Sequence, residues 1–234
     1  MIPGKGALGA PAFFTGKALR LSLFLFFPWS LAAVDAPRPC DDLRAYLSNS
    51  PSLGAEKSPG LDLACQAILL KLEEGRSKRI PPPLLRRIID AIVDYTRLFR
   101  EQAATNAGAS SLLEQRPVYG YLADFAAGSI PFPHFLALQQ TYLQRYPKEV
   151  GTFFASCDAY LLSVSFGVSK GLALESVAHL SASSERRPAL GWLDAFYTHA
   201  ETHQMDPDRA ARILLTLSGP LSHKRLLQAV DDFR

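Results

Sequence analysis

The fold is decided by one amphipathic stretch, residues 83–104, which reads PLLRRIIDAIVDYTRLFREQAA. Its apolar residues recur every three or four positions, which is the spacing of a single helix face. They are Leu84, Leu85, Ile88, Ile89, Ile92, Val93 and Phe99. The spacing predicts a long helix with Ile88 or Ile92 fully buried in the core and Arg87 exposed.

The charged residues of the same stretch support this helix. Arg86 with Asp90, and Asp94 with Arg97, are spaced to pair on its outer side. Three prolines at 81–83 precede it, and proline is tolerated in a first helical turn, where its missing N–H has no partner to lose.

The same pattern continues along the chain. Further helices are predicted at 61–74, 117–127, 133–146, 149–166 and 188–203, and Asp206 with Pro207, and Ser222, are start signals for two more. No segment alternates with period two, and no Asn-Gly or Asp-Gly hairpin turn occurs. The sequence therefore predicts an all-α fold of about nine or ten helices.

A weak repeat at the turns indicates how these helices pair. Residues 75–80 and 167–172 both read Gly-x-Ser-Lys-x-[Ile/Leu], and residues 129–131 and 204–207 have a similar form. The shared pattern is a helix, a turn, one buried aliphatic residue, a cap and the next helix. It predicts stacked helical hairpins. Residues 74–85 also resemble segments of uncharacterised secreted bacterial proteins, and this resemblance implies no activity.

The first 32 residues have the features of a secretory signal peptide. Three basic residues, Lys5, Lys17 and Arg20, precede an apolar segment that ends in a run of small residues. The apolar segment, 21–33, has 13 residues, whereas a membrane span needs roughly 20. We expect cleavage after Ala32, with Ala33 or Ala36 as alternatives, and a periplasmic or secreted protein. A retained leader that tethers the chain to the inner membrane is the alternative.

Removal of this leader leaves one neutral all-α domain, residues 33–234, with a subdomain boundary possible near 104–111. The whole chain has 25 basic and 22 acidic residues, and the leader holds three of the basic ones and no acid. The rest is therefore balanced at 22 of each. A neutral chain gives no electrostatic reason to expect binding to nucleic acid, or strong binding to a membrane surface.

Three cysteines remain after the leader. Export permits a disulfide, and Cys40 with Cys65 is the favoured pair because it closes the shortest loop. The alternative is three free thiols, with Cys157 the third, that behave as small apolar residues.

One catalytic motif is present. Residues 167–171 match the Gly-x-Ser-x-Gly nucleophile elbow around Ser169, and Asp194 and His223 follow in the order of the hydrolase triad. The elbow requires a strand before the serine, which only residues 161–166 could provide. The competing interpretation is that Gly167 ends a helix.

One metal motif is present. His199 and His203 lie four residues apart, so one helix face could offer both imidazoles to zinc, with Asp206 or Asp208 as a third ligand. The competing interpretation is two histidines that complement a helix dipole. No cofactor is expected.

Aromatic residues concentrate in residues 119–166, which hold 11 of the 18 aromatics that follow the leader. Most are at helical spacing and belong to the core. Tyr119, Tyr121 and Phe132 lie near helix ends and are the expected partner surface. The leading hypothesis is a non-enzymatic, extracytoplasmic helical protein that binds another protein. The alternatives are an envelope hydrolase, with Ser169 or a zinc ion, and a membrane-tethered structural protein.

Overall fold

The structure, a computed structural model, describes residues 40–41, 60–146, 149–182 and 186–233. All of these lie in one compact unit, Pro37–Arg234. The helices with ten or more residues are α2 Leu61–Ser77, α3 Pro82–Thr105, α5 Arg116–Ala127, α6 Phe132–Arg145, α7 Val150–Ser165, α8 Lys170–Ser181, α10 Leu193–Thr202, α11 Pro207–Thr216 and α12 His223–Asp232. Two short helices, α4 Ala107–Ser110 and α9 Arg186–Gly191, complete the list. The described residues contain no strand, so the predicted all-α fold is confirmed. The predicted leader lies outside the described residues.

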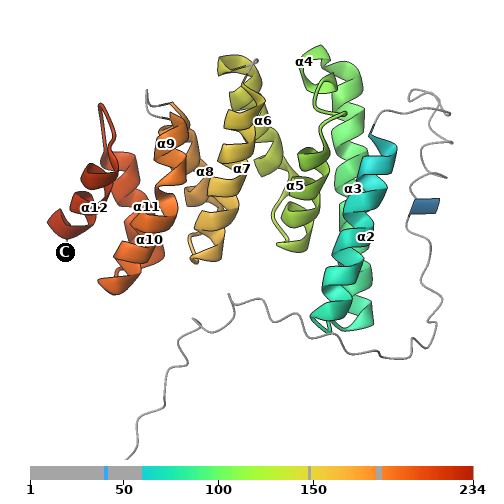
Figure 1. The fold of residues 1–234 in the computed structure, drawn as a ribbon, viewed down its shortest axis with the longest axis horizontal. Helices are drawn as coiled ribbons and strands as arrows, with labels where there is room; N and C mark the ends of the chain where they lie inside the picture. Colours follow the sequence, from blue (N-terminus) through green and yellow to red (C-terminus); the bar gives the residue numbers. More distant parts are fainter. Residues whose placement is uncertain (1–39, 42–59, 147–148, 183–185, 234) are drawn as a thin grey trace, which may run out of the picture. The chain divides into compact units, whose positions relative to one another are not determined.

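The helices pack as antiparallel hairpins in two layers (Figure 1). The hairpins are α2 with α3, α5 with α6, α7 with α8, and α10 with α11. Within one layer, α2, α5, α7, α10 and α12 pack in that order, and within the other, α3, α4, α6, α8 and α11 do so. Each hairpin therefore covers the apolar face of the next, as the turn pattern predicts.

The same backbone motif forms the turn of all four hairpins. Each turn contains one residue with a positive φ: Arg79 between α2 and α3, Ser129 between α5 and α6, Gly167 between α7 and α8, and Gln204 between α10 and α11. The aliphatic residue that follows is Ile80, Ile130, Val168 or Met205, and its N–H donates to the carbonyl five residues earlier, at 2.8 to 3.2 Å. This is the Schellman arrangement, in which a left-handed residue lets the chain satisfy the last carbonyls of one helix before the next begins.

The structure corrects the register of the predicted repeat. Helix α2 continues to Ser77, three residues beyond the predicted end at residue 74, and Gly75 is buried inside it. The residue equivalent to Gly167 is therefore Arg79 and not Gly75. A Cβ on Gly75 would lie 2.4 Å from Leu85 Cδ1, so this glycine permits the close approach of α3.

Two other boundaries differ from the predictions. The predicted 188–203 helix is divided, because Trp192 separates α9 from α10. The 103–111 stretch contains the short helix α4, which packs on both α3 and α6. The subdomain boundary expected there stays a prediction.

The long helix α3 is buried along one face, as expected. Ile92 is 1% exposed and Ile89 is buried, but Ile88 is only half-buried and Leu84 is exposed. The predicted pairs form on the outer side: Arg86 Nε lies 2.8 Å from Asp90 Oδ1, and Arg97 Nη2 lies 3.7 Å from Asp94 Oδ1.

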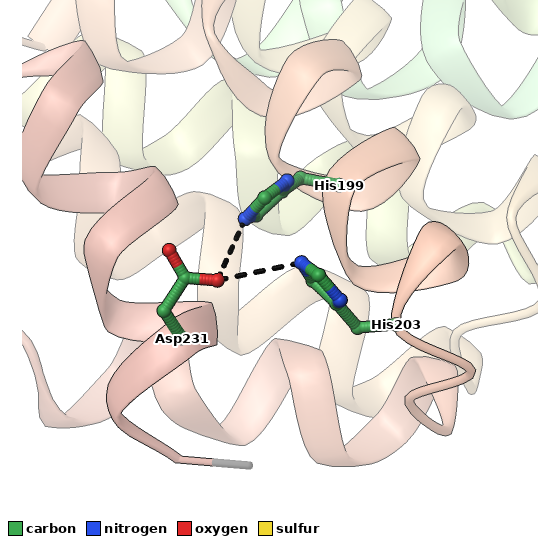
Figure 2. A group of neighbouring side chains, drawn as sticks. All are labelled: His199, His203 and Asp231. Atoms are coloured by element: carbon green, nitrogen blue, oxygen red, sulfur yellow. Dashed lines mark hydrogen bonds and ion pairs between the residues drawn. The ribbon is translucent and has the colours of Figure 1, made fainter.

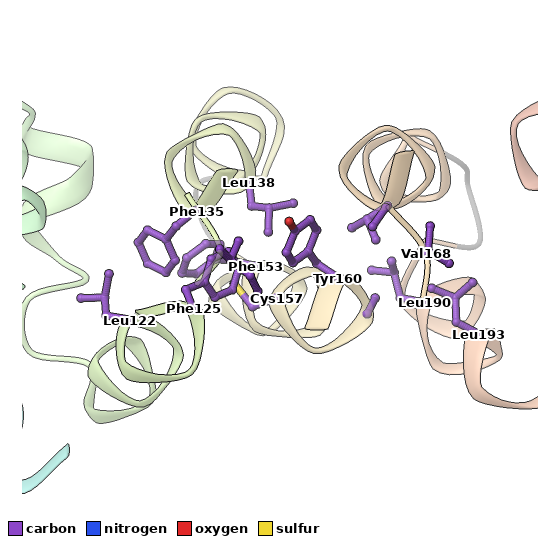
Figure 3. Packing of buried hydrophobic residues seen from close by; sticks show 14 of the residues in the cluster. Leu122, Phe125, Phe135, Leu138, Phe153, Cys157, Tyr160, Val168, Leu190 and Leu193 are labelled. Atoms are coloured by element: carbon purple, nitrogen blue, oxygen red, sulfur yellow. The ribbon is translucent and has the colours of Figure 1, made fainter. Parts of the chain in front are cut away.

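Aromatic rings fill the centre of the core between α5, α6 and α7 (Figure 3). Phe125 meets Phe135 edge to face and stacks on Tyr160, and Phe135 meets Phe153 edge to face, with centroids 5.2 to 5.6 Å apart. These are the preferred geometries of aromatic pairs. Most of the aromatic cluster is therefore structural, as the helical spacing predicts.

Candidate functional site

A groove of about 280 Å³ lies between α2 and α5, on the surface of the layer formed by α2, α5, α7, α10 and α12. Its lining from α2 is Leu63, Gln66, Ala67, Leu70, Lys71 and Glu74, and from α5 it is Arg116, Gly120, Ala123 and Asp124. The α2 residues recur at three- and four-residue intervals, so they form one continuous stripe along the helix.

Small residues hollow out this groove. Ala67 and Ala123 are buried, and no atom lies within 4 Å of the position that a Cβ on Gly120 would occupy. Leu70 lies on the α2 side of the groove with 56% of its surface exposed, and Leu63, about two turns earlier on the same helix face, is half-buried. The groove therefore offers an apolar surface that nothing among the described residues covers.

Charged residues lie at the two ends of the groove. At one end, Lys71 Nζ lies 2.6 Å from both Glu74 Oε2 and Asp124 Oδ1, so it links α2 to α5. At the other end, Arg116 is exposed and makes no ion pair with any described residue.

The ion pair of Lys71 with Glu74 is charged near neutral pH. Burial lowers the pKa of Lys71, but the hydrogen bonds to Asp124 and Glu74 outweigh it, so the pKa is raised overall. Hydrogen bonds from Lys71 and Lys78 lower the pKa of Glu74. Lys71 therefore stays protonated and Glu74 stays ionised. Because Lys71 is already paired with two carboxylates, Arg116 is the cation that the groove offers to a ligand.

The predicted partner surface is wrong for two of its three residues. Tyr119 is 1% exposed and its hydroxyl donates to the Leu113 carbonyl at 2.8 Å, while Phe132 is 8% exposed. Tyr121 is half-buried, stacks on Phe154 and donates to Asp158 Oδ1 at 2.8 Å. Burial, and then the Asp158 carboxylate, raise the pKa of Tyr121.

The hydrolase motif lacks its structural context. The element before Ser169 is the helix α7, not a strand, and Gly167 at φ 95° ends that helix. The backbone N–H of Ser169 donates to Asp208 Oδ1 at 2.7 Å, and no hydrogen bond joins Ser169 to His223 within the described part of the chain. His223 instead lies beside the Trp192 ring, and Asp194 is exposed in the first turn of α10. The structure does not bring these three residues together as a triad.

The histidine pair does come together, with a different third residue (Figure 2). Asp231 Oδ1 on α12 lies 3.0 Å from His199 Nε2 and 3.3 Å from His203 Nε2 on α10. The expected third ligands are engaged elsewhere: Asp206 accepts from the Arg209 N–H as the cap of α11, and Asp208 accepts from Ser169. The sequence carries no signal for Asp231, because only the packing of α12 on α10 places it there.

The cysteines are free thiols in the structure, with Cys40 half-buried and Cys65 and Cys157 buried. The Cys40–Cys65 pairing stays a prediction. Complete burial raises the pKa of the Cys157 thiol well above its ordinary value, so it stays protonated and packs as an apolar group.

Among the described residues, no helix is both long and apolar enough to cross a membrane.

No protein-family model matches the chain, and the searches of curated proteins and of solved structures found no match.

Proposed function

We propose that this chain is an extracytoplasmic helical protein that binds another protein by taking an apolar segment of it into the groove between α2 and α5. The observation that carries this proposal is the groove itself, with the exposed Leu70 beside the open space above Gly120. Exposed apolar surface rimmed by polar residues is typical of interaction sites.

The size of the groove favours a peptide over a small molecule. Ligand pockets hold about 300 to 1,000 Å³ and enclose most of the ligand. The α2/α5 groove, at about 280 Å³, is below this range and is not enclosed. It suits one or two side chains of a segment that lies along it, as when an amphipathic helix docks its apolar face.

The charges of the groove define the partner segment further. Lys71 is already paired with two carboxylates, whereas Arg116 is exposed at the opposite end. We expect a segment with apolar residues at three- or four-residue spacing and an acidic residue at the end that lies over Arg116.

The test is selection of peptides from a displayed library on the wild-type chain, followed by affinity measurements on variants. Gly120→Leu places a side chain in the groove at a position where a Cβ would meet nothing within 4 Å. It should weaken binding of the selected peptides by roughly tenfold or more, since buried apolar contacts dominate such interfaces. Gly171→Leu is the control, because Gly171 is an exposed helical glycine on α8 with equally open space.

The charge is tested separately by Arg116→Glu, which should weaken peptides that carry the acidic residue and not those that lack it. Equal affinity of the selected peptides for the wild type and for Gly120→Leu would contradict the proposed site. Failure to select any apolar peptide would contradict the proposed function.

A further inference from the structure

Two imidazoles and one carboxylate converge at the contact between α10 and α12. His199 lies in the last turn of α10 and His203 directly follows that helix, so both rings emerge on the same side. Both point toward Asp231 of α12, as Figure 2 shows, and one ligand atom from each of the three residues lies within 4.8 Å of the other two.

These separations suit a tetrahedral metal ion. Zinc lies about 2.0 to 2.2 Å from histidine nitrogen and carboxylate oxygen, so two ligand atoms of a tetrahedral site are roughly 3.3 Å apart. The two distances from Asp231 Oδ1, 3.0 Å to His199 Nε2 and 3.3 Å to His203 Nε2, are close to this value. The third separation, between one ring nitrogen of each histidine, is within 4.8 Å, so the ion would draw these two ligands together.

We propose that His199, His203 and Asp231 bind one divalent transition-metal ion of the zinc class, which links the helix α12 to α10. Two imidazole nitrogens with one carboxylate are ligands that suit zinc, whereas calcium and magnesium prefer oxygen ligands alone. Asp231 is 51% exposed, so the ion has a path from solvent and a fourth position open to water.

The link has a structural consequence at the end of the chain. Helix α12 is the last described helix, and it packs mainly on α10 and α11 through Leu226 and Val230. An ion held by ligands from both helices adds a connection that the unfolded chain lacks, so its binding should stabilise the folded state. Without the ion, His199 forms a hydrogen bond with Asp231, and His203 lies within ion-pair distance of the same carboxylate. A contact of this kind that holds no metal is the competing explanation for the cluster.

The test is calorimetric titration of Zn²⁺ into the untagged chain at neutral pH, in a Cys40→Ser background because the half-buried Cys40 thiol could also bind zinc. We expect one ion per chain, and a rise in Tm of roughly 5 to 10 °C when free Zn²⁺ exceeds the Kd about a hundredfold. Substitution by Co²⁺ should give the visible absorption of a tetrahedral ion without a thiolate band.

The variants assign the ligands. Asp231→Asn should weaken Zn²⁺ binding by at least about tenfold, since even residues that only support a ligand contribute that much. Asp232→Asn makes the same change in charge at the next, exposed position and should bind Zn²⁺ as the parent does. Absence of binding by the parent chain would overturn the proposal, as would equal binding by Asp231→Asn. If Asp231→Asn fails to fold, the same comparison is made with His203→Gln against His223→Gln.

Discussion

The same substitution, glycine to alanine, should change the free energy of unfolding in opposite directions at two sites four residues apart. One site is Gly167, in a hairpin turn, and the other is Gly171, in helix α8. Gly167 has φ 95°, which an L residue with a side chain rarely adopts, while Gly171 lies within the first turn of the right-handed helix α8. A Cβ on Gly167 would meet its nearest neighbour, Pro207 Cγ, at an ordinary 3.6 Å, and a Cβ on Gly171 would meet nothing within 4 Å. Neither change therefore creates a clash, and backbone conformation alone decides the effect.

Gly167→Ala should lower the free energy of unfolding by about 1 to 2 kcal/mol, the difference between alanine and glycine in a left-handed conformation. Gly171→Ala should raise it by about 0.5 to 1 kcal/mol, because alanine favours the helix and restricts the unfolded chain. The expected changes in Tm are roughly 2 to 4 °C per kcal/mol for a chain of this size.

A third variant tests the same reasoning from the other direction. Ser129 occupies the equivalent turn position at φ 51°, so Ser129→Gly should remove the strain of a side chain there and stabilise the protein by up to about 1 kcal/mol. Urea unfolding of the three variants measures all these effects. A destabilising effect of Ser129→Gly together with a neutral effect of Gly167→Ala would refute the assignment of the turns.

Three further predictions follow from the fold. Ile92→Ala removes a fully buried side chain and should cost about 2 to 5 kcal/mol, whereas exposed Arg87→Ala should change stability by less than about 0.5 kcal/mol in urea unfolding. Burial and then the charge of Lys170 lower the pKa of His134, so the folded state favours the neutral ring. The free energy of unfolding should therefore fall as the pH drops below about 6.5, the pKa of histidine in the unfolded chain. His134→Gln should flatten this part of the curve of stability against pH. N-terminal sequencing of the exported protein should begin at Ala33 or within a few residues of it, and a full-length chain found only in the cytosol would contradict the export prediction.

The helices could be predicted from the sequence because each is encoded locally. The apolar stripe of α3 and the caps at Asp206 and Ser222 depend only on residues within a few turns, and both caps accept a backbone N–H as expected. The predicted end of α2 is three residues short of the observed one, because Gly75 permits close packing of α3 and does not stop the helix. A sequence pattern alone does not distinguish these two uses of glycine.

The sites could be predicted only in part, because they form between helices. His199 and His203 are visible as a pair at helical spacing, but Asp231 joins them through the contact of α10 with α12. Tyr119 was expected to be exposed because it lies near a helix start. It is buried because α5 packs against both α2 and α3. The groove was missed because the open space at Gly120 depends on the packing of α2 beside α5.

The packing of each hairpin mainly against its neighbours bears on the export that we propose for this chain. Most contacts join segments close in sequence, and proteins with such local contacts fold quickly and can begin folding from any repeat. A polypeptide exported in extended form emerges from one end. Under the proposed export, each hairpin of this chain can form as soon as its own two helices have crossed the membrane. The later helices then add to a surface that already exists. This architecture suits vectorial folding, in which no part of the fold needs the last residues before it can begin.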